Sequence, residues 1–202
     1  MHCLVKNGKI AMGPIALPTR WKNDSGNIID LTSLTPTELD TLGWFPVIPD
    51  TTIIDPNLTD VVSTSYSISG NTVIETIATR TLSISEVMIR KIDEIVDYSD
   101  ALLEGTFVWN GHTIVGDSTS RQNITGLASA VANNVPLPAG FTWTDATGLP
   151  IPMTKTDVIS LGATTMGWVD MIYKNAQKHA GAVQMLTSIS AIVAYDYSTG
   201  WP

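Results

Sequence analysis

The chain has 202 residues and a mass of 21.7 kDa, which is enough for one or two domains with a substantial core. Its 19 acidic and 11 basic residues give a formal charge of −8, so phosphate groups would be repelled and binding to nucleic acid or anionic membranes is unexpected. The single cysteine excludes an intrachain disulfide. With only 3 histidines beside it, a zinc site built from protein ligands alone is also unexpected.

No apolar run approaches the roughly 20 residues that a membrane-spanning helix needs. A short apolar patch at Ile10–Leu17 is broken by Gly13 and Pro14 and lacks a small-residue cleavage site. We therefore do not interpret it as a signal peptide. We expect no membrane insertion, and we expect the chain to fold in a cytoplasm.

Residues 1–82 are expected to form an N-terminal docking part made of short strands and extended segments, because turn signals are dense there. Near its end, Val61–Ser69 and Asn71–Thr81 alternate partly between apolar and polar residues around a Ser-Gly-Asn turn. This pattern predicts a β-hairpin.

A short helix is expected in the middle of this docking part. Thr35 is a good N-cap, Glu38 completes a capping box, and Gly43 is placed to end the helix. The helix and the extended segment after it present apolar and aromatic side chains that we expect to anchor a partner: Leu39, Leu42, Trp44 and Phe45.

A single amphipathic helix is predicted for residues 83–104, closed by Gly105. Its apolar residues recur in alternating steps of four and three, which is a heptad pattern that further apolar positions widen. Two interpretations stay open: a helix that packs on its own domain, or a connecting helix that joins subunits, with a homotrimer favoured. In the second interpretation the oligomer seam consists of Met88, Ile92, Ile95 and Leu102.

Residues 105–202 are expected to form a compact α+β domain of short hairpins and helices. The Asn110-Gly111 dipeptide between apolar strand formers predicts a two-residue hairpin turn. In chain order we expect a hairpin over Thr106–Val115, a helix capped by Asp117 and Ser118 and ending near Ala132, and a hairpin over Phe141–Met153. A long helix from Thr154 to about His179 and a last helix from about Gly181 or Val183 to Tyr195 follow.

The sequence contains no Gly-rich phosphate loop, no paired-cysteine metal spacing and no nucleophile elbow. We expect His112, after a hairpin turn, to be solvated or structural. We expect His179 at a helix end, where carbonyl partial charges stabilise a cation. We therefore expect no enzyme activity and no catalytic, cofactor-binding or metal-binding residue. Three roles stay open for the tryptophans at element edges or turns: a lid on the core, an anchor in a subunit interface, or a platform that stacks on a sugar. These tryptophans are Trp44, Trp109, Trp143 and Trp201.

An ordered set of motifs runs through the second half of the chain. These motifs are Gly105-Thr-Phe-Val-Trp-Asn-Gly111, Asp117-Ser-Thr-Ser-Arg-Gln-Asn-Ile124, Phe141-Thr-Trp143, Pro152-Met-Thr154 and a final Gly-Trp-Pro. In order and spacing they resemble a domain family of unknown function found at the C-terminus of phage tail and tail-fibre proteins. The earlier run Leu-Thr-Pro-Thr-Glu-Leu-Asp-Thr-Leu-Gly-Trp-Phe-Pro-Val is similar to a segment often joined to that domain. No catalytic residue is established for the family, so none is carried over.

The resemblance implies a structural virion protein of a tailed bacteriophage, made in the host cytoplasm. It would be a tail-fibre or baseplate component, an adaptor or a short fibre, whose partners are other phage tail, fibre or baseplate proteins. Such a protein would act by burying apolar surface between chains and by adding extended segments to neighbouring sheets. Two alternatives stay open: a tail-fibre assembly chaperone, and a receptor-binding or glycan-cleaving fibre tip.

Overall fold

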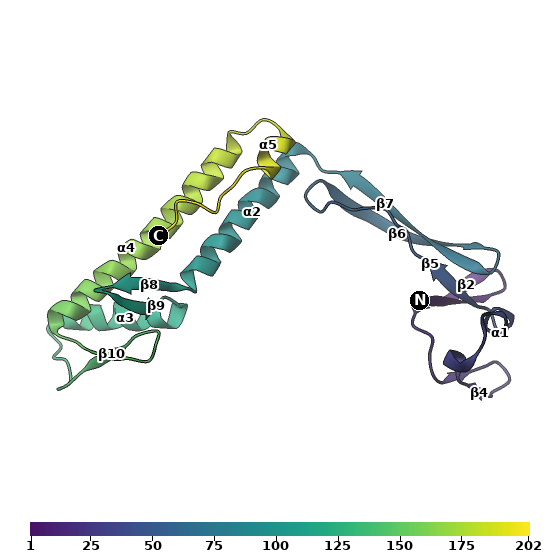
Figure 1. Ribbon diagram of the computed structural model, residues 1–202, viewed down its shortest axis with the longest axis horizontal. Helices are drawn as coiled ribbons and strands as arrows, with labels where there is room; N and C mark the ends of the chain where they lie inside the picture. Colours follow the sequence, from purple (N-terminus) through teal and green to yellow (C-terminus); the bar gives the residue numbers. More distant parts are fainter. The chain divides into compact units, whose positions relative to one another are not determined.

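The computed structural model describes residues 1–202, which divide into two compact units, Met1–Leu82 and Ser83–Pro202 (Figure 1). Helices make up 39% of the chain and strands 28%, with a strand-rich first unit and most helical residues in the second. The chain is therefore α+β, as the sequence predicts. None of its helices combines the length and the apolar character that crossing a lipid bilayer requires.

The first unit is built on a five-stranded sheet with the order β2-β1-β5-β7-β6. β1 (His2–Lys6) pairs antiparallel with both β2 (Lys9–Ile15) and β5 (Trp44–Ile48). β5 runs parallel to β7 (Thr72–Thr81), and β6 (Thr59–Ser69) pairs antiparallel with β7 along its whole length. The predicted hairpin is thus confirmed as β6–β7.

Local sequence signals place the helix of the first unit. α1 (Pro36–Thr41) begins after the N-cap Thr35, whose hydroxyl oxygen accepts from the Glu38 N–H while the Glu38 carboxylate accepts from the Thr35 N–H, so the predicted capping box is confirmed. Gly43 follows at φ +79°, and a Cβ there would lie 2.4 Å from the Val5 carbonyl oxygen, so this exit requires glycine. The remaining short elements are β3 (Trp21–Lys22), β4 (Ile28–Ile29) and the 3₁₀ helix η1 (Leu31–Ser33).

The second unit is organised around two long helices, α2 (Ile84–Leu103) and α4 (Lys155–Gln184), which lie side by side (Figure 1). α3 (Ser118–Ala132) packs against α4, and the short α5 (Ile189–Val193) packs against α2. Both α2 and α3 begin where the sequence predicts them, because Ser83 and Asp117 cap them with their own side chains.

Two hairpins complete this unit, and both are confirmed predictions. β8 (Thr106–Trp109) pairs with β9 (His112–Val115), and β10 (Thr142–Thr144) pairs with β11 (Pro150–Pro152). The β8–β9 turn has positive φ at both central residues, 47° at Asn110 and 79° at Gly111. Such a type I′ turn matches the strand twist and aligns the two strands without a bulge.

The core of the second unit lies where α4 crosses β8 and α3. The Phe107 and Trp168 rings stack there with centroids 5.0 Å apart. Gly116 lets the Trp168 ring approach the main chain, since a Cβ on this glycine would lie 2.4 Å from the ring. Other fully buried side chains of this core are Ile114, Ile124, Val158, Leu161 and Ile172.

The end of α4 and the last helix differ from prediction. α4 continues through Gly181 to Gln184, because the fully buried Val183 extends the buried face of the helix. A glycine inside a helix costs only about 1 kcal/mol relative to alanine, which core packing exceeds. The last helix is correspondingly shorter and begins only after the N-cap Ser188, so the prediction of a start at Gly181 or Val183 is wrong.

Candidate interaction surfaces

The residues expected to anchor a partner lie largely inside the first unit. Trp44 is fully buried and Leu39 is buried, together with Leu4 and Leu31. Trp21 packs its ring edge-on against Trp44, with centroids 5.9 Å apart. Their burial makes them core residues in this conformation. Of the four expected anchors, only two retain partly exposed side chains: Leu42 and Phe45.

The residues expected to form an oligomer seam face mainly inward as well. Ile95 is fully buried, Leu102 is half-buried against the core of the second unit, and Met88 and Ile92 are half-buried. The heptad pattern of α2 therefore supplies packing inside the second unit. Two of the apolar residues that flank this heptad pattern lie on the outer side of α2, where Ile89 is 58% exposed and Val96 is 45% exposed.

A second outward apolar stripe lies on α4, and the sequence interpretation missed it. Ile159, Met166 and Tyr173 follow one another at seven-residue intervals and are 48%, 67% and 50% exposed. Seven residues are close to two helical turns, so the three side chains lie on one face. The spacing is visible in the sequence, but only burial distinguishes this face from the inward one.

The segment after α5 is held against both long helices. His179 of α4 is buried, and its Nε2 donates to the Thr199 carbonyl oxygen at 3.0 Å, since a carbonyl can only accept. Its Nδ1 lies 2.9 Å from the Tyr195 hydroxyl oxygen, and the two atoms share a hydrogen bond. The Trp201 ring stacks on the His179 ring and also meets Tyr98 of α2. The expectation that His179 lies at a helix end is therefore wrong, because α4 continues past it.

The other histidine and tryptophans singled out by the sequence have structural surroundings. His112 lies 3.7 Å from a carboxylate oxygen of Asp145, which caps the β10–β11 turn. Hydrogen bonds from the Thr147 hydroxyl and the Leu149 N–H hold the pKa of Asp145 below its usual value. Trp109 is buried and donates to the Ser160 hydroxyl, while two tryptophans are half-buried against the core: Trp143 and Trp201.

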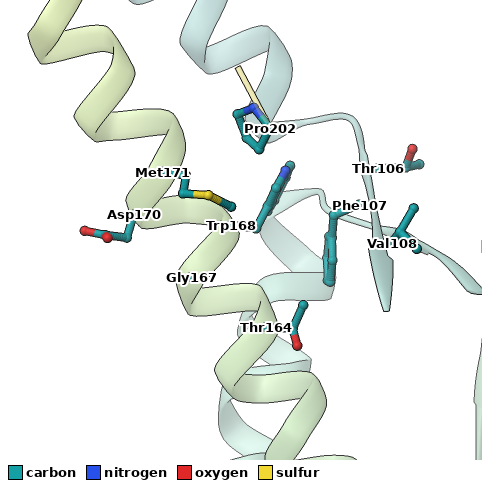
Figure 2. Close-up of a pocket in the computed structure, with 9 residues that line it drawn as sticks. All are labelled: Thr106, Phe107, Val108, Thr164, Gly167, Trp168, Asp170, Met171 and Pro202. Carbon is teal, nitrogen blue, oxygen red and sulfur yellow. The ribbon is translucent and has the colours of Figure 1, made fainter. Parts of the chain in front are cut away.

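An apolar trough of about 690 Å³ lies between β8 and α4 (Figure 2). The stacked rings of Phe107 and Trp168 form its floor, and Val108 and Met171 flank it. Asp170 borders it on α4, with its carboxylate pointing away from the two rings. Thr106, Thr164, Gly167 and Pro202 complete the lining. No grouping of three or more His, Cys, Asp or Glu side chains in the chain could hold a metal ion.

Comparison with known proteins adds a family but no described relative. No curated protein and no solved structure matches the chain. A family model described as a domain of unknown function, DUF4376, matches residues 87–199, which begin within the first turn of α2 and run through α5 to Thr199. Since this match covers more than half of the chain, the protein belongs to the DUF4376 family.

Proposed function

We propose that this chain is a structural virion protein of a tailed bacteriophage that acts by protein–protein assembly in a tail fibre or baseplate. In this proposal it forms a homo-oligomer, with a trimer favoured, and contacts other tail, fibre or baseplate proteins. The observation that carries the proposal is the outward apolar stripe of α4, formed by Ile159, Met166 and Tyr173.

This stripe has the pattern of a helix that packs against a helix of another chain. Apolar residues repeated every seven positions present a continuous seam, and α4 has 30 residues, so it is about 45 Å long. Covering the exposed part of each side chain would contribute roughly 1 kcal/mol or more per residue. The outer flank of α2, with Ile89 and Val96, offers a second stripe of the same spacing.

The assignment to a phage particle is supported by the ordered motifs of the second half of the chain. The Asn-Gly turn of β8–β9, the Asp117 cap of α3 and the terminal Gly-Trp-Pro follow one another as in domains of phage tail and tail-fibre proteins. The family match, over residues 87–199, covers these motifs except the terminal Gly-Trp-Pro. In the structure these motifs occupy turns, helix caps and packing positions. They therefore support a shared fold more directly than a shared function.

Quantitative mass spectrometry of purified particles tests the proposal, with the signal scaled to a major tail protein. We expect the chain in mature particles at a fixed copy number, and a multiple of three would agree with a trimer. Its absence from particles combined with abundance in infected-cell lysate would contradict a virion role and favour an assembly chaperone.

A further inference from the structure

We propose that the trough between β8 and α4 binds an extended, basic peptide segment of a partner protein, with an apolar side chain inserted over Phe107 and Trp168. This inference rests on the proposed assembly function and names how a partner chain is held. It concerns a different surface from the helical stripes of α2 and α4.

The outer edge of β8 has main-chain groups that the hairpin does not use. In a hairpin with a two-residue turn, the residues flanking the turn exchange both main-chain hydrogen bonds, and the pairs then alternate. The bonded pairs of this hairpin are therefore Trp109 with His112 and Phe107 with Ile114. The Gly116 N–H donates to the Gly105 carbonyl oxygen at 2.8 Å, which continues the same alternation.

It follows that Thr106 and Val108 direct their N–H and C=O groups away from β9. No other main-chain hydrogen bond in the chain engages these groups. A strand edge of this kind is the complement of an extended backbone, which can pair with it through two residues at alternate positions.

The floor beside this edge is suited to an apolar side chain. The Phe107 and Trp168 rings are stacked at an interplanar angle of 26° and are themselves almost fully buried, so the floor is fixed in place. Val108 is 68% exposed and Met171 is also exposed, leaving apolar surface that a ligand would cover. The volume of about 690 Å³ lies within the roughly 300–1,000 Å³ typical of small-ligand pockets, so there is room for one apolar side chain.

The wall of the trough on α4 is kept open by Gly167. A Cβ built on this glycine would meet no atom within 4 Å, so no packing contact requires glycine there. Glycine inside a helix is unfavourable by about 1 kcal/mol relative to alanine. The lack of a side chain at Gly167 leaves room for the inserted side chain of a partner.

Charge favours a basic segment over an acidic one. Asp170 borders the trough, but its carboxylate points away from the two rings and pairs with Lys174, so the preference for a basic segment is a general one and does not depend on a single ion pair. The whole chain carries a formal charge of −8, which also attracts a basic partner.

The test uses the full chain and a blocked peptide of sequence Lys-Thr-Leu-Thr-Lys, which as a strand places leucine and both lysines on one face. Titration followed by amide NMR should shift the signals of Thr106, Val108 and Gly167. A peptide with methyl groups on its central three amide nitrogens should lose binding, and one with glutamate in place of both lysines should bind more weakly.

Two matched variants locate the site. Gly167→Leu adds a side chain to the trough wall at a position where an added Cβ meets no atom within 4 Å, and it should weaken binding by about tenfold or more, the effect expected when a pocket is occupied. Gly181→Leu makes the same change in α4 at another position where an added Cβ meets no atom within 4 Å, and binding should stay within about twofold of wild type.

Equal affinity of wild type and Gly167→Leu, shifts confined to other surfaces, or no shift at millimolar peptide would overturn the inference. Each of these results leaves the copy number in particles untouched, so failure of the trough and failure of the proposed function are distinguishable. Conversely, peptide binding by a chain that is absent from particles would support the peptide site in the trough and contradict the virion role.

Discussion

Arg121 of α3 donates a hydrogen bond from Nη1 to the main-chain carbonyl oxygen of Leu103, the last residue of α2. The same nitrogen also donates to the Gly116 carbonyl oxygen at 2.5 Å, and the other Nη lies 3.5 Å from the Glu104 carboxylate. One side chain therefore ties the end of α2 to the link between β9 and α3. It also satisfies a carbonyl at the helix terminus, where no helical partner is available.

Replacing this guanidinium should destabilise the second unit. Arg121→Met keeps a long apolar stem but leaves both carbonyl oxygens without their charged donor, so we expect a loss of about 2–3 kcal/mol in unfolding free energy. Denaturation in urea measures it. Arg121→Lys retains one cation and should lose less. Equal stability of Arg121→Met and wild type would show that water replaces the guanidinium without cost.

A methyl group at Gly116 should be more harmful than its size suggests. Gly116→Ala places Cβ 2.4 Å from the Trp168 ring, which is held in the stacked pair with Phe107, so we expect a loss of about 1–3 kcal/mol from forced repacking. The matched change Gly181→Ala, in open space on a helix, should stabilise by about 0.5–1 kcal/mol. Thermal unfolding of both variants checks the opposite signs.

Asp50 should make the first unit sensitive to acid. The Ile77 N–H donates to one carboxylate oxygen at 2.7 Å, and the Thr52 hydroxyl and N–H donate to the other, which lowers the pKa of Asp50 below its ordinary value of 3.8. A group with a depressed folded-state pKa contributes stability above its unfolded pKa and loses it as the pH falls through the folded value.

Below about pH 4, wild type should therefore lose stability more steeply than Asp50→Ala, while the variant should already be less stable at pH 7. Unfolding free energies measured between pH 7 and pH 2.5 give both curves. Parallel curves would mean that the carboxylate bonds seen here make no net contribution to folding.

The outer stripe of α4 should control association of the full chain. Met166→Lys places a charge at the centre of the stripe and should lower the oligomeric state in sedimentation velocity, because burying an unpaired cation is strongly unfavourable. Asn123→Lys adds the same charge at an exposed position of α3 and should leave association unchanged. If both variants sediment like wild type, this stripe is not a subunit contact.

What the sequence predicts well is what neighbouring residues decide. The starts of α1, α2 and α3 follow from caps at Thr35, Ser83 and Asp117, and the β8–β9 turn follows from one Asn-Gly dipeptide. Each of these signals acts over about four residues, so no tertiary information is needed.

What the sequence misses depends on contacts between distant segments. From sequence, Trp44 is compatible with a partner anchor and with a core lid, and only its packing with Leu4 and Leu31 places it in the core of the first unit. The sequence predicts that the helix ends at His179, yet α4 continues because Val183 is buried one turn later. On α2 and α4 the apolar spacing fits more than one face, and only the packed structure separates the inner face from the outer stripe.

The pairing order of the first sheet has a consequence for synthesis on the ribosome. β1 and β2 are neighbours in the chain, but the second partner of β1 is β5, which emerges roughly 30 residues after β2. At about 5–20 residues per second, the nascent hairpin waits on the order of seconds with one edge unpaired and Leu4 uncovered. A chaperone that recognises short apolar strands would have its opportunity in that interval, before Trp44 arrives to close the core.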